Sequence, residues 1–246
     1  MIDKTPRDER GMLIAITGID GAGKSTLAHE LCGYLTEHGH NIVRVGKHTV
    51  SVPANHDLTQ YLDAVNAVVY RRKPEVGAMC GVHYWLLALA SWYTLLDTLV
   101  ITPALRAGVH VIVDNTHHKI VARYATKPDV SPDLARLAFA HLTTPDAVLH
   151  LRVTPDEALR RKGQFTALEA GYSGESAEHF IAYQRQVTEQ LANHGDQDGW
   201  AVIDANDSGP DQVLRDALTI LAEHGIGPLD LDTATQAATS RAKANA

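Results

Sequence analysis

The sequence predicts an α/β fold, a doubly wound parallel sheet with helices on both faces. Short apolar runs alternate along the chain with segments in which apolar residues recur at helical spacing, and glycines mark the boundaries. The first apolar run, 13–16, leads directly into a glycine-rich turn and then into a helix. A chain of 246 residues, 45% of them hydrophobic, is long enough for one large domain with its own core, which we expect over 1–227.

The first part of the chain supplies two strands and two helices. The helix after the glycine-rich turn is expected to run to about Glu37 and to end near Gly39. A second strand follows over 41–45. We then expect a loop over 46–56 and a helix over 57–70, where apolar residues have helical spacing.

A long apolar segment, 82–106, is expected to form a helix with a kink near Pro103. Its length would suffice to cross a membrane, but it contains Asp97 and several threonines, and its aromatic residues are not confined to its ends. A buried helix explains this pattern better than a membrane span. Because the helix is apolar all round, its outer face is expected to pack on a second subunit.

The second half of the chain continues the alternation. A strand over 110–113 ends at Asp114, and Thr154 with Pro155 and two acidic residues begins a helix. Neither a linker nor a repeat divides this part. The further elements are expected in this order: helix 132–142, strand 147–151, the helix from Thr154 to Lys162, a mobile loop over 164–176, helix 176–193, strand 201–203, helix 210–224 and a flexible tail over 228–246.

The glycine-rich turn matches a phosphate-binding motif in full. Gly18, Gly23, Lys24 and Ser25 fill the fixed positions of the Walker A pattern G-x-x-x-x-G-K-[ST], between a strand and a helix. Backbone N–H groups can surround an anion only where no Cβ blocks its approach, and the N-terminus of a helix attracts negative charge. Lys24 can reach the β- and γ-phosphates of a nucleotide, and the Ser25 hydroxyl can bind Mg²⁺. The expected nucleotide-binding residues are Gly18, Gly21, Ala22, Gly23, Lys24, Ser25 and Thr26.

Two other groups are candidates for catalysis. Asp114 follows a buried strand at the same edge of the sheet as the loop, so its carboxylate can hold Mg²⁺ or accept a proton from a substrate hydroxyl; alternatively, it caps a turn. Arg160 and Arg161 precede a glycine-bearing loop, and we expect about 160–175 to close as a lid over a transferring phosphoryl group. The alternative for these two arginines is a basic helix C-terminus.

Composition excludes several classes of partner. The net charge of −7 argues against a nucleic-acid partner, which would require a basic surface. Cys32 and Cys80 form no metal or disulfide pattern, and the 14 histidines have no ligand spacing. The first ten residues contain no signal-peptide core. We therefore expect a cytoplasmic protein without a membrane partner.

The segment 17–26, TGIDGAGKST, resembles the phosphate-binding loop of thymidylate kinases. Later segments resemble the same family in the same order: 103–108, 110–114, 149–151, 155–159 and 180–184. The resemblance extends over about 12–222. It implies the P-loop kinase fold with a five-stranded sheet, the use of ATP and Mg²⁺, and often a homodimer formed through the helix 82–106. It also implies that Asp20 contacts a sugar hydroxyl of the substrate.

The positions that bind the phosphoryl acceptor in this family differ in this sequence at three places. Asn115 stands where the family has an arginine, Gly46-Lys47-His48-Thr49 replaces an arginine and an acidic-proline motif, and 91–94 lacks an arginine that reads the base. Neither asparagine nor tyrosine can replace a bidentate cation. The cations that can compensate are Arg44, Lys47, Arg72, Lys119 and Arg123.

These observations lead to three hypotheses. The first is an ATP-dependent kinase that phosphorylates a hydroxyl of a nucleoside-like, sugar or aminocyclitol acceptor, with Asp20 or Asp114 as the base. The second is a nucleoside monophosphate kinase of the thymidylate type with relocated cations. The third is a regulatory nucleotide-binding module without catalysis, against which the intact Lys24, Ser25 and Asp114 argue.

Overall fold

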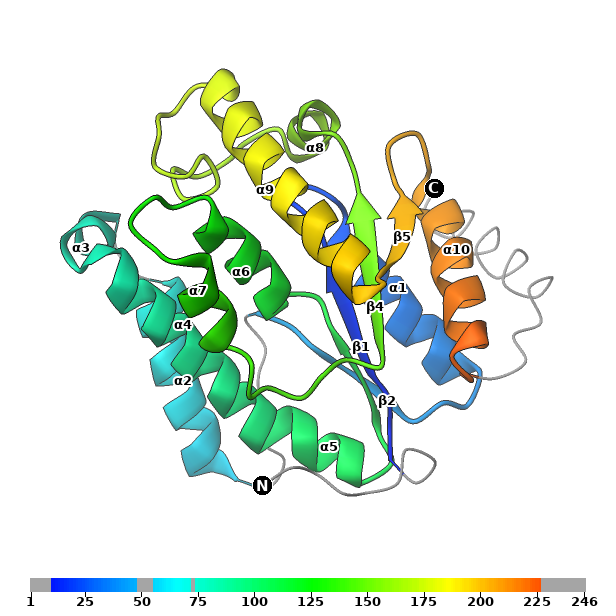
Figure 1. The fold of residues 1–246 in the computed structure, drawn as a ribbon. Helices are drawn as coiled ribbons and strands as arrows, with labels where there is room; N and C mark the ends of the chain where they lie inside the picture. Colours follow the sequence, from blue (N-terminus) through cyan, green and yellow to red (C-terminus); the bar gives the residue numbers. More distant parts are fainter. Residues whose placement is uncertain (1–9, 48–54, 72–73, 227–246) are drawn as a thin grey trace.

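A computed structural model of the chain describes residues 10–47, 55–71 and 74–226. Its centre is a sheet of five parallel strands in the order β2-β3-β1-β4-β5 (Figure 1). The predicted five-stranded parallel sheet is therefore confirmed. The strands are β1 (Leu13–Thr17), β2 (Ile42–Val45), β3 (His110–Val113), β4 (Ala147–Arg152) and β5 (Ala201–Asp204).

Helices cover both faces of the sheet, as expected (Figure 1). Successive residues of a strand point to opposite faces, so Leu13 packs with one set of helices while Ile14 and Ile16 pack with the other. The core around Ile14 and Ile16 includes α1 (Lys24–Glu37), α8 (Pro155–Lys162), α9 (Ala177–Asp198) and α10 (Pro210–Glu223). The core around Leu13 includes α2 (His56–Tyr70), α4 (Gly81–Leu96), α5 (Thr102–Arg106) and α7 (Pro132–Leu137), while α6 (His117–Ala125) contributes to both.

The apolar helix expected over 82–106 begins at Gly81 and contains a wider turn. Between α4 and α5, Asp97–Ile101 forms a π-helical turn in which the Thr102 N–H donates to the Asp97 carbonyl, five residues back. Pro103 has no N–H and its ring would crowd the carbonyl four residues earlier, so widening the preceding turn relieves the backbone. The irregularity thus lies before the proline and not at it.

Other differences concern short helices. The sequence did not predict α3 (Pro74–Met79) or α6, and the helix expected over 132–142 ends at Leu137. Over 163–176 the chain forms turns without helix or strand, as predicted, while the mobility of this loop stays a prediction. Arg72, most of the loop 46–56 and the tail 228–246 lie outside the described residues.

The continuous helix Gly81–Arg106 is long and apolar enough to cross a membrane by length and composition. A core helix of a soluble protein passes the same test, so this is weak evidence for a membrane span. Leu86 and Trp92 in this helix are completely buried within the protein. The helix therefore serves as part of the core.

Candidate functional site

The glycine-rich loop joins β1 to α1 and packs closely on β4 and α8. Gly18 has a φ of +144°, and a Cβ there would lie 2.6 Å from the Leu151 carbonyl oxygen. Gly21 has a φ of +87°, and a Cβ there would collide with the Ala158 carbonyl oxygen. Both positions thus require glycine for conformation and for space. The loop ends at Gly23, where α1 begins without a side-chain cap, so its first N–H groups are available to an anion.

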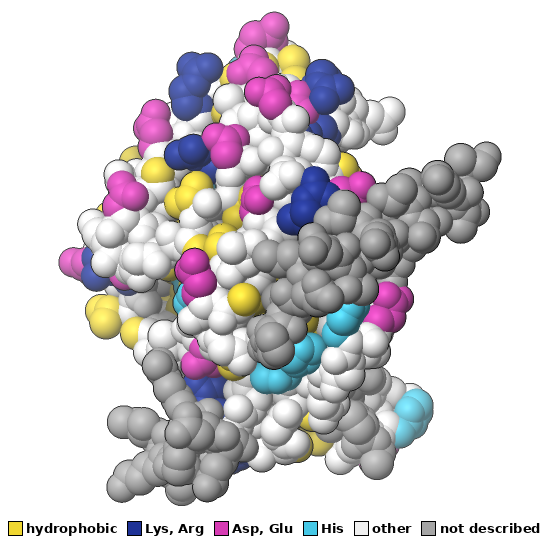
Figure 2. Space-filling view, turned by 90° about the vertical axis from the view of Figure 1, so that its right-hand side faces the viewer, with side chains coloured by type: hydrophobic (Ala, Val, Ile, Leu, Met, Phe, Trp, Pro, Cys, Tyr) yellow, Lys and Arg dark blue, Asp and Glu magenta, His cyan; other side chains and the backbone are white. Residues whose placement is uncertain are grey.

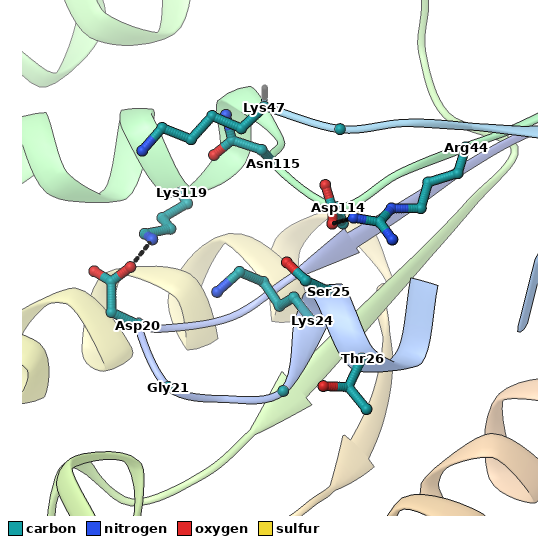
Figure 3. A pocket seen from close by; sticks show the side chains of 12 residues that line it. Asp20, Gly21, Lys24, Ser25, Thr26, Arg44, Lys47, Asp114, Asn115 and Lys119 are labelled. Atoms are coloured by element: carbon teal, nitrogen blue, oxygen red, sulfur yellow. Dashed lines mark hydrogen bonds and ion pairs between the residues drawn. The ribbon is translucent and has the colours of Figure 1, made fainter. Parts of the chain in front are cut away.

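A cavity of about 700 Å³ lies where this loop meets the carboxyl ends of β2 and β3 (Figure 3). It brings Asp20, Lys24, Ser25 and Thr26 of the loop segment together with Asp114, which is distant in sequence. Ligands of parallel α/β proteins bind at this edge of the sheet. The cavity is lined by Asp20, Gly21, Gly23, Lys24, Ser25, Thr26, Arg44, Gly46, Lys47, Asp114, Asn115 and Lys119.

Lys24 points into this cavity and bonds to its own loop. Its ammonium donates a hydrogen bond of 2.6 Å to the Ile19 carbonyl oxygen. Burial lowers the pKa of Lys24, although Asp20 and Asp114 favour its charged form. A nucleotide phosphate placed at the loop would supply a further negative partner for this buried cation.

Asp114 and Ser25 place a carboxylate and a hydroxyl in the first cavity. Asp114 directly follows β3 and its side chain is only 4% exposed, and Arg44 Nη2 from β2 lies 3.3 Å from its Oδ2. Among the described residues there is no group of three or more His, Cys, Asp or Glu side chains that could hold a metal. Mg²⁺ in nucleotide sites needs no such group, because phosphates and water complete its coordination. A carboxylate and a hydroxyl in one cavity therefore fit Mg²⁺.

Asp20 is the centre of a buried ion-pair cluster, which we call the Asp20 cluster: Asp20, Lys119, Arg123 and Gln184. Lys119 pairs with Oδ1, while Arg123 Nη2 lies 2.5 Å and Gln184 Nε2 lies 3.3 Å from Oδ2. The Asp20 N–H donates to Gln184 Oε1 at 3.3 Å. Gln184 is completely buried. The cluster therefore connects the phosphate-binding loop to α6 and α9.

Electrostatics favour the charged forms of Asp20 and Arg123, whereas burial works against the charge of Lys119. Burial opposes ionisation of Asp20, but the charges of Lys119, Arg123 and Lys24 outweigh it and hold the Asp20 pKa well below its usual range. Burial lowers the pKa of Lys119, against the attraction of Asp20. For Arg123 burial lowers the pKa, but the attraction of Asp20, Tyr183 and Glu169 together outweighs burial and raises the pKa. Asp20 is thus a poor proton acceptor.

Asn115, which stands where the family has an arginine, forms hydrogen bonds with two tyrosines. Its Nδ2 donates to the Tyr70 hydroxyl at 2.9 Å, and its carbonyl oxygen accepts from the Tyr93 hydroxyl at 3.0 Å. The Lys47 ammonium lies 4.6 Å from the centre of the Tyr70 ring. No local pattern predicts this network, because its members come from four separate segments.

Arg160 and Arg161 lie beside a second cavity, of about 540 Å³, on the other side of the loop. Arg161 Nη2 donates to the carbonyl oxygens of Ala205 at 2.5 Å and Asn206 at 2.7 Å. Arg160 is largely exposed and pairs with Glu157 at 2.6 Å. Hydrogen bonds from the two arginines lower the pKa of Glu157 to about 2. Neither arginine lines the first cavity, whereas Ala22 lines the second and Gly18 lines neither.

A protein-family model described as Thymidylate kinase matches residues 16–217. The chain belongs to the thymidylate kinase family. Its relatives include proteins named thymidylate kinase from Xanthomonas euvesicatoria pv. vesicatoria, 32% identical over 86% of this chain and 83% of the relative, and from Fervidobacterium nodosum, 31% identical over 61% and 71%. Another, from Chlorobium luteolum, is 29% identical over 67% of this chain and 72% of the relative.

Membership in the thymidylate kinase family confirms several predictions. The fold is the P-loop kinase fold, and the protein is an ATP-dependent phosphotransferase that uses Mg²⁺. The hypothesis of a module without catalysis does not agree with this family. The expectation of an acceptor hydroxyl, on a nucleoside-like molecule, a sugar or an aminocyclitol, finds no support among these relatives, which are named thymidylate kinase.

The sequence identified the charged residues better than their partners. Lys119, Arg123, Arg44 and Lys47 were considered as compensating cations, and the structure places all four at or beside the first cavity. No sequence pattern indicated that two of these cations, Lys119 and Arg123, bind Asp20. Helical spacing of Ile120, Val121 and Tyr124 after Thr116 was the available signal for the helix that carries these cations.

Proposed function

We propose that this enzyme is a nucleoside monophosphate kinase, which transfers the γ-phosphoryl group of ATP to the phosphate of a nucleoside monophosphate. The proposal rests on the family and on the charges that line the first cavity. It takes up the second of the hypotheses made from the sequence.

The observation that carries the proposal is the charge balance of that cavity. Four cations line it, Lys24, Arg44, Lys47 and Lys119, against two carboxylates, and each carboxylate already faces a cation. Lys119 is buried, Lys24 and Lys47 are partly buried and Arg44 is exposed, and the surplus of positive charge that they form favours anionic partners. The phosphates of ATP account for part of the surplus, and an acceptor phosphate accounts for the rest. A neutral hydroxyl acceptor would leave part of this positive charge without an anionic ligand.

The same ion pairs favour an acceptor that needs no base. A hydroxyl must lose a proton during phosphoryl transfer, and Asp20 and Asp114, the candidates for the base, are both paired with cations. The second pKa of a phosphate monoester is about 6, so an acceptor phosphate is already ionised at neutral pH. Its oxygen can attack directly.

In the proposed reaction an oxygen of the acceptor phosphate attacks the γ-phosphorus while the bond from that phosphorus to the β,γ-bridging oxygen breaks. ADP leaves with the bonding electron pair, and a nucleoside diphosphate forms. Lys24 stabilises the charge on the transferring group. Ser25 and Asp114 would hold Mg²⁺, which neutralises phosphate charge when it is bound.

The two cavities bind different parts of the two substrates. The adenosine of ATP occupies the second cavity beside Arg161, and its phosphates extend over the glycine-rich loop into the first. Arg44 and Lys47 hold the acceptor phosphate and so replace the arginine that the family has at the position of Asn115. Arg160 and Arg161 belong to the segment 160–175, which closes over the site as a lid and excludes water.

Thymidylate is the acceptor to test first, because the relatives carry its name. The enzyme is proposed to be cytoplasmic and homodimeric. Its dimer forms through the long helix, where α2 and α4 pack together and leave apolar side chains exposed. These are Tyr61, Val68, Tyr84 and Leu87.

A turnover panel tests the proposal. Purified enzyme with ATP and Mg²⁺ is given nucleoside monophosphates, the parent nucleosides, and sugars and aminocyclitols, and the products are identified by mass spectrometry. The proposal expects a nucleoside diphosphate from at least one monophosphate and no phosphorylated nucleoside. Phosphorylation of a hydroxyl, with every monophosphate left unchanged, would overturn it.

A further inference from the structure

The Asp20 cluster suggests how the enzyme distinguishes acceptors at the sugar. Resting on the proposed function, we infer that this cluster recognises the acceptor sugar through its cations and not through its carboxylate. The sugar substituent that lies there must then accept hydrogen bonds, and a cationic substituent is excluded. This reverses the polarity of a site in which a loop aspartate accepts a hydrogen bond from a sugar hydroxyl.

The oxygens of Asp20 are largely occupied within the protein. A carboxylate has about four lone-pair positions for hydrogen bonds. Lys119 uses one on Oδ1, and Arg123 and Gln184 share Oδ2. The side chains of Asp20, Lys119 and Arg123 are only 13%, 9% and 11% exposed. A ligand hydroxyl that donates to Asp20 would have to compete with buried charged partners.

The cluster carries a net positive charge. Two cations stand against one carboxylate, and Lys24 adds a third positive charge within range of Asp20. The charge of Glu169, on the segment between α8 and α9, reaches Arg123 and Lys24, but the Glu169 carboxylate is bound to Lys162 at 3.2 Å and to Thr166. The potential at this end of the cavity therefore favours a hydrogen-bond acceptor or an anion.

Lys119 is the cation of the cluster that lines the first cavity, whereas Arg123 does not line it. Asp20 lines the same cavity, and an ammonium has three N–H donors, of which Asp20 takes one. Figure 3 shows Asp20 and Lys119 at one end of the cavity, Arg44 and Asp114 at the other, and Lys24 between them. A nucleoside monophosphate whose phosphate lies near Lys24 extends its sugar toward Asp20 and Lys119.

A 2′-deoxynucleoside 5′-monophosphate has one free sugar hydroxyl, at the 3′ position, so it offers a direct test. The kcat/KM values are compared for three acceptors that differ only there: hydroxyl, hydrogen and amino. At about pH 6.5 an alkyl amine is protonated. The base is that of the monophosphate with the highest turnover in the panel above.

For the wild type we expect kcat/KM with the 3′-ammonium acceptor to be at least about 30-fold lower than with the 3′-hydroxyl acceptor, because Lys119 and Arg123 repel the ammonium group. Replacement of the 3′-hydroxyl by hydrogen should lower kcat/KM by less, about 3- to 10-fold, since only one hydrogen bond is lost. A wild type that uses the ammonium acceptor as well as the hydroxyl acceptor overturns the inference. So does a loss on removal of the hydroxyl that exceeds the loss with ammonium.

Lys119→Met provides the second half of the test. The substitution leaves Oδ1 of Asp20 open to the ligand and removes one positive charge. In this variant, kcat/KM with the ammonium acceptor should rise to within about 3-fold of the value with the hydroxyl acceptor. Lys127→Met is the matched control, because Lys127 bonds to the Gly171 carbonyl at 3.2 Å and does not line the first cavity. It should keep the wild-type preference. An unchanged preference in Lys119→Met contradicts the inference.

Failure of the inference and failure of the proposed function give different results. If no nucleoside monophosphate is turned over, the proposed function is wrong and the inference falls with it. If monophosphates are turned over and the ammonium acceptor is preferred, only the inference is wrong. The comparison of three acceptors on the wild type decides the matter even if Lys119→Met does not fold.

Discussion

The charged side chains of the glycine-rich loop each have a protein partner. Lys24 bonds to the Ile19 carbonyl, and Asp20 is bound by Lys119 and Arg123. Since Lys24 lies buried in the cavity, its charge is stabilised further when phosphates are bound. The proposed roles of Lys24 and Asp114 can each be tested by a single substitution.

Lys24→Met should lower kcat by about 10³-fold or more, because it removes the cation nearest the transferring phosphoryl group. Steady-state assays with saturating acceptor measure the effect. The thermal stability of the variant should stay close to that of the wild type, since methionine fills similar space. Turnover within about 10-fold of the wild type would contradict the role of Lys24.

Asp114→Asn should raise the Mg²⁺ concentration needed for half-maximal activity by at least about 10-fold and lower kcat. The amide keeps the size of the side chain but loses the charge that pairs with Arg44 and that would face Mg²⁺. A magnesium titration at fixed ATP gives the measurement. Unchanged magnesium dependence would show that Asp114 serves only as a partner of Arg44.

At the scale of single elements, the strands and the long helices were predictable because each buries a periodic apolar face. The motif at 18–25 fixed the position of the phosphate-binding loop to the residue. Helix α6 was not predictable in the same way, because its buried positions include Lys119, which is stabilised by Asp20 from a distant segment. Polar burial of this kind depends on tertiary partners that no local pattern contains.

Helix α6 also carries a partly buried histidine, and it gives a pH prediction. The His117 ring stacks on Phe139 at 5.6 Å, and burial lowers the His117 pKa to about 4, with a smaller effect of His141. Its folded-state pKa lies below the unfolded value of about 6.5, so the unfolded state binds more protons and stability falls as pH falls from 6.5 toward 4. The loss at pH 5 is about 1–2 kcal/mol.

His117→Phe keeps the ring and should remove this part of the pH dependence. Chemical denaturation at about pH 7.5 and pH 5 measures the difference in unfolding free energy. The variant should lose less stability than the wild type between the two values. The control His83→Gln changes an exposed histidine and should behave as the wild type. Equal losses in wild type and His117→Phe would refute the assignment.

At the scale of the whole molecule, the topology decides which residues meet. The strand order places β1 between β3 and β4, so the glycine-rich loop, Asp114 and the residues after β2 share one edge of the sheet. The alternation of strands and helices predicted this edge and hence the meeting of Lys24 with Asp114. The pairing of Asn115 with two tyrosines could not be predicted, because it depends on how α2 and α4 pack beside that edge.

The surface of α2 and α4 predicts association. Leu87 is 58% exposed in the middle of α4, beside exposed apolar residues of both helices. The wild type should sediment as a dimer, at twice the 26.7 kDa of one chain, and Leu87→Glu should sediment as a monomer. Val202→Glu, an exposed position on the edge strand β5, is the control and should stay dimeric. A monomeric wild type at micromolar concentration would contradict this prediction.

The central claim is that the first cavity binds an acceptor phosphate through relocated cations. The most direct measurement is the affinity of the enzyme for a nucleoside monophosphate and for its parent nucleoside, by calorimetry, in the wild type and in Arg44→Met/Lys47→Met. We expect the wild type to bind the monophosphate at least about 30-fold more tightly than the nucleoside, and the double variant to lose most of this preference. Equal affinity of the wild type for both ligands would contradict the claim.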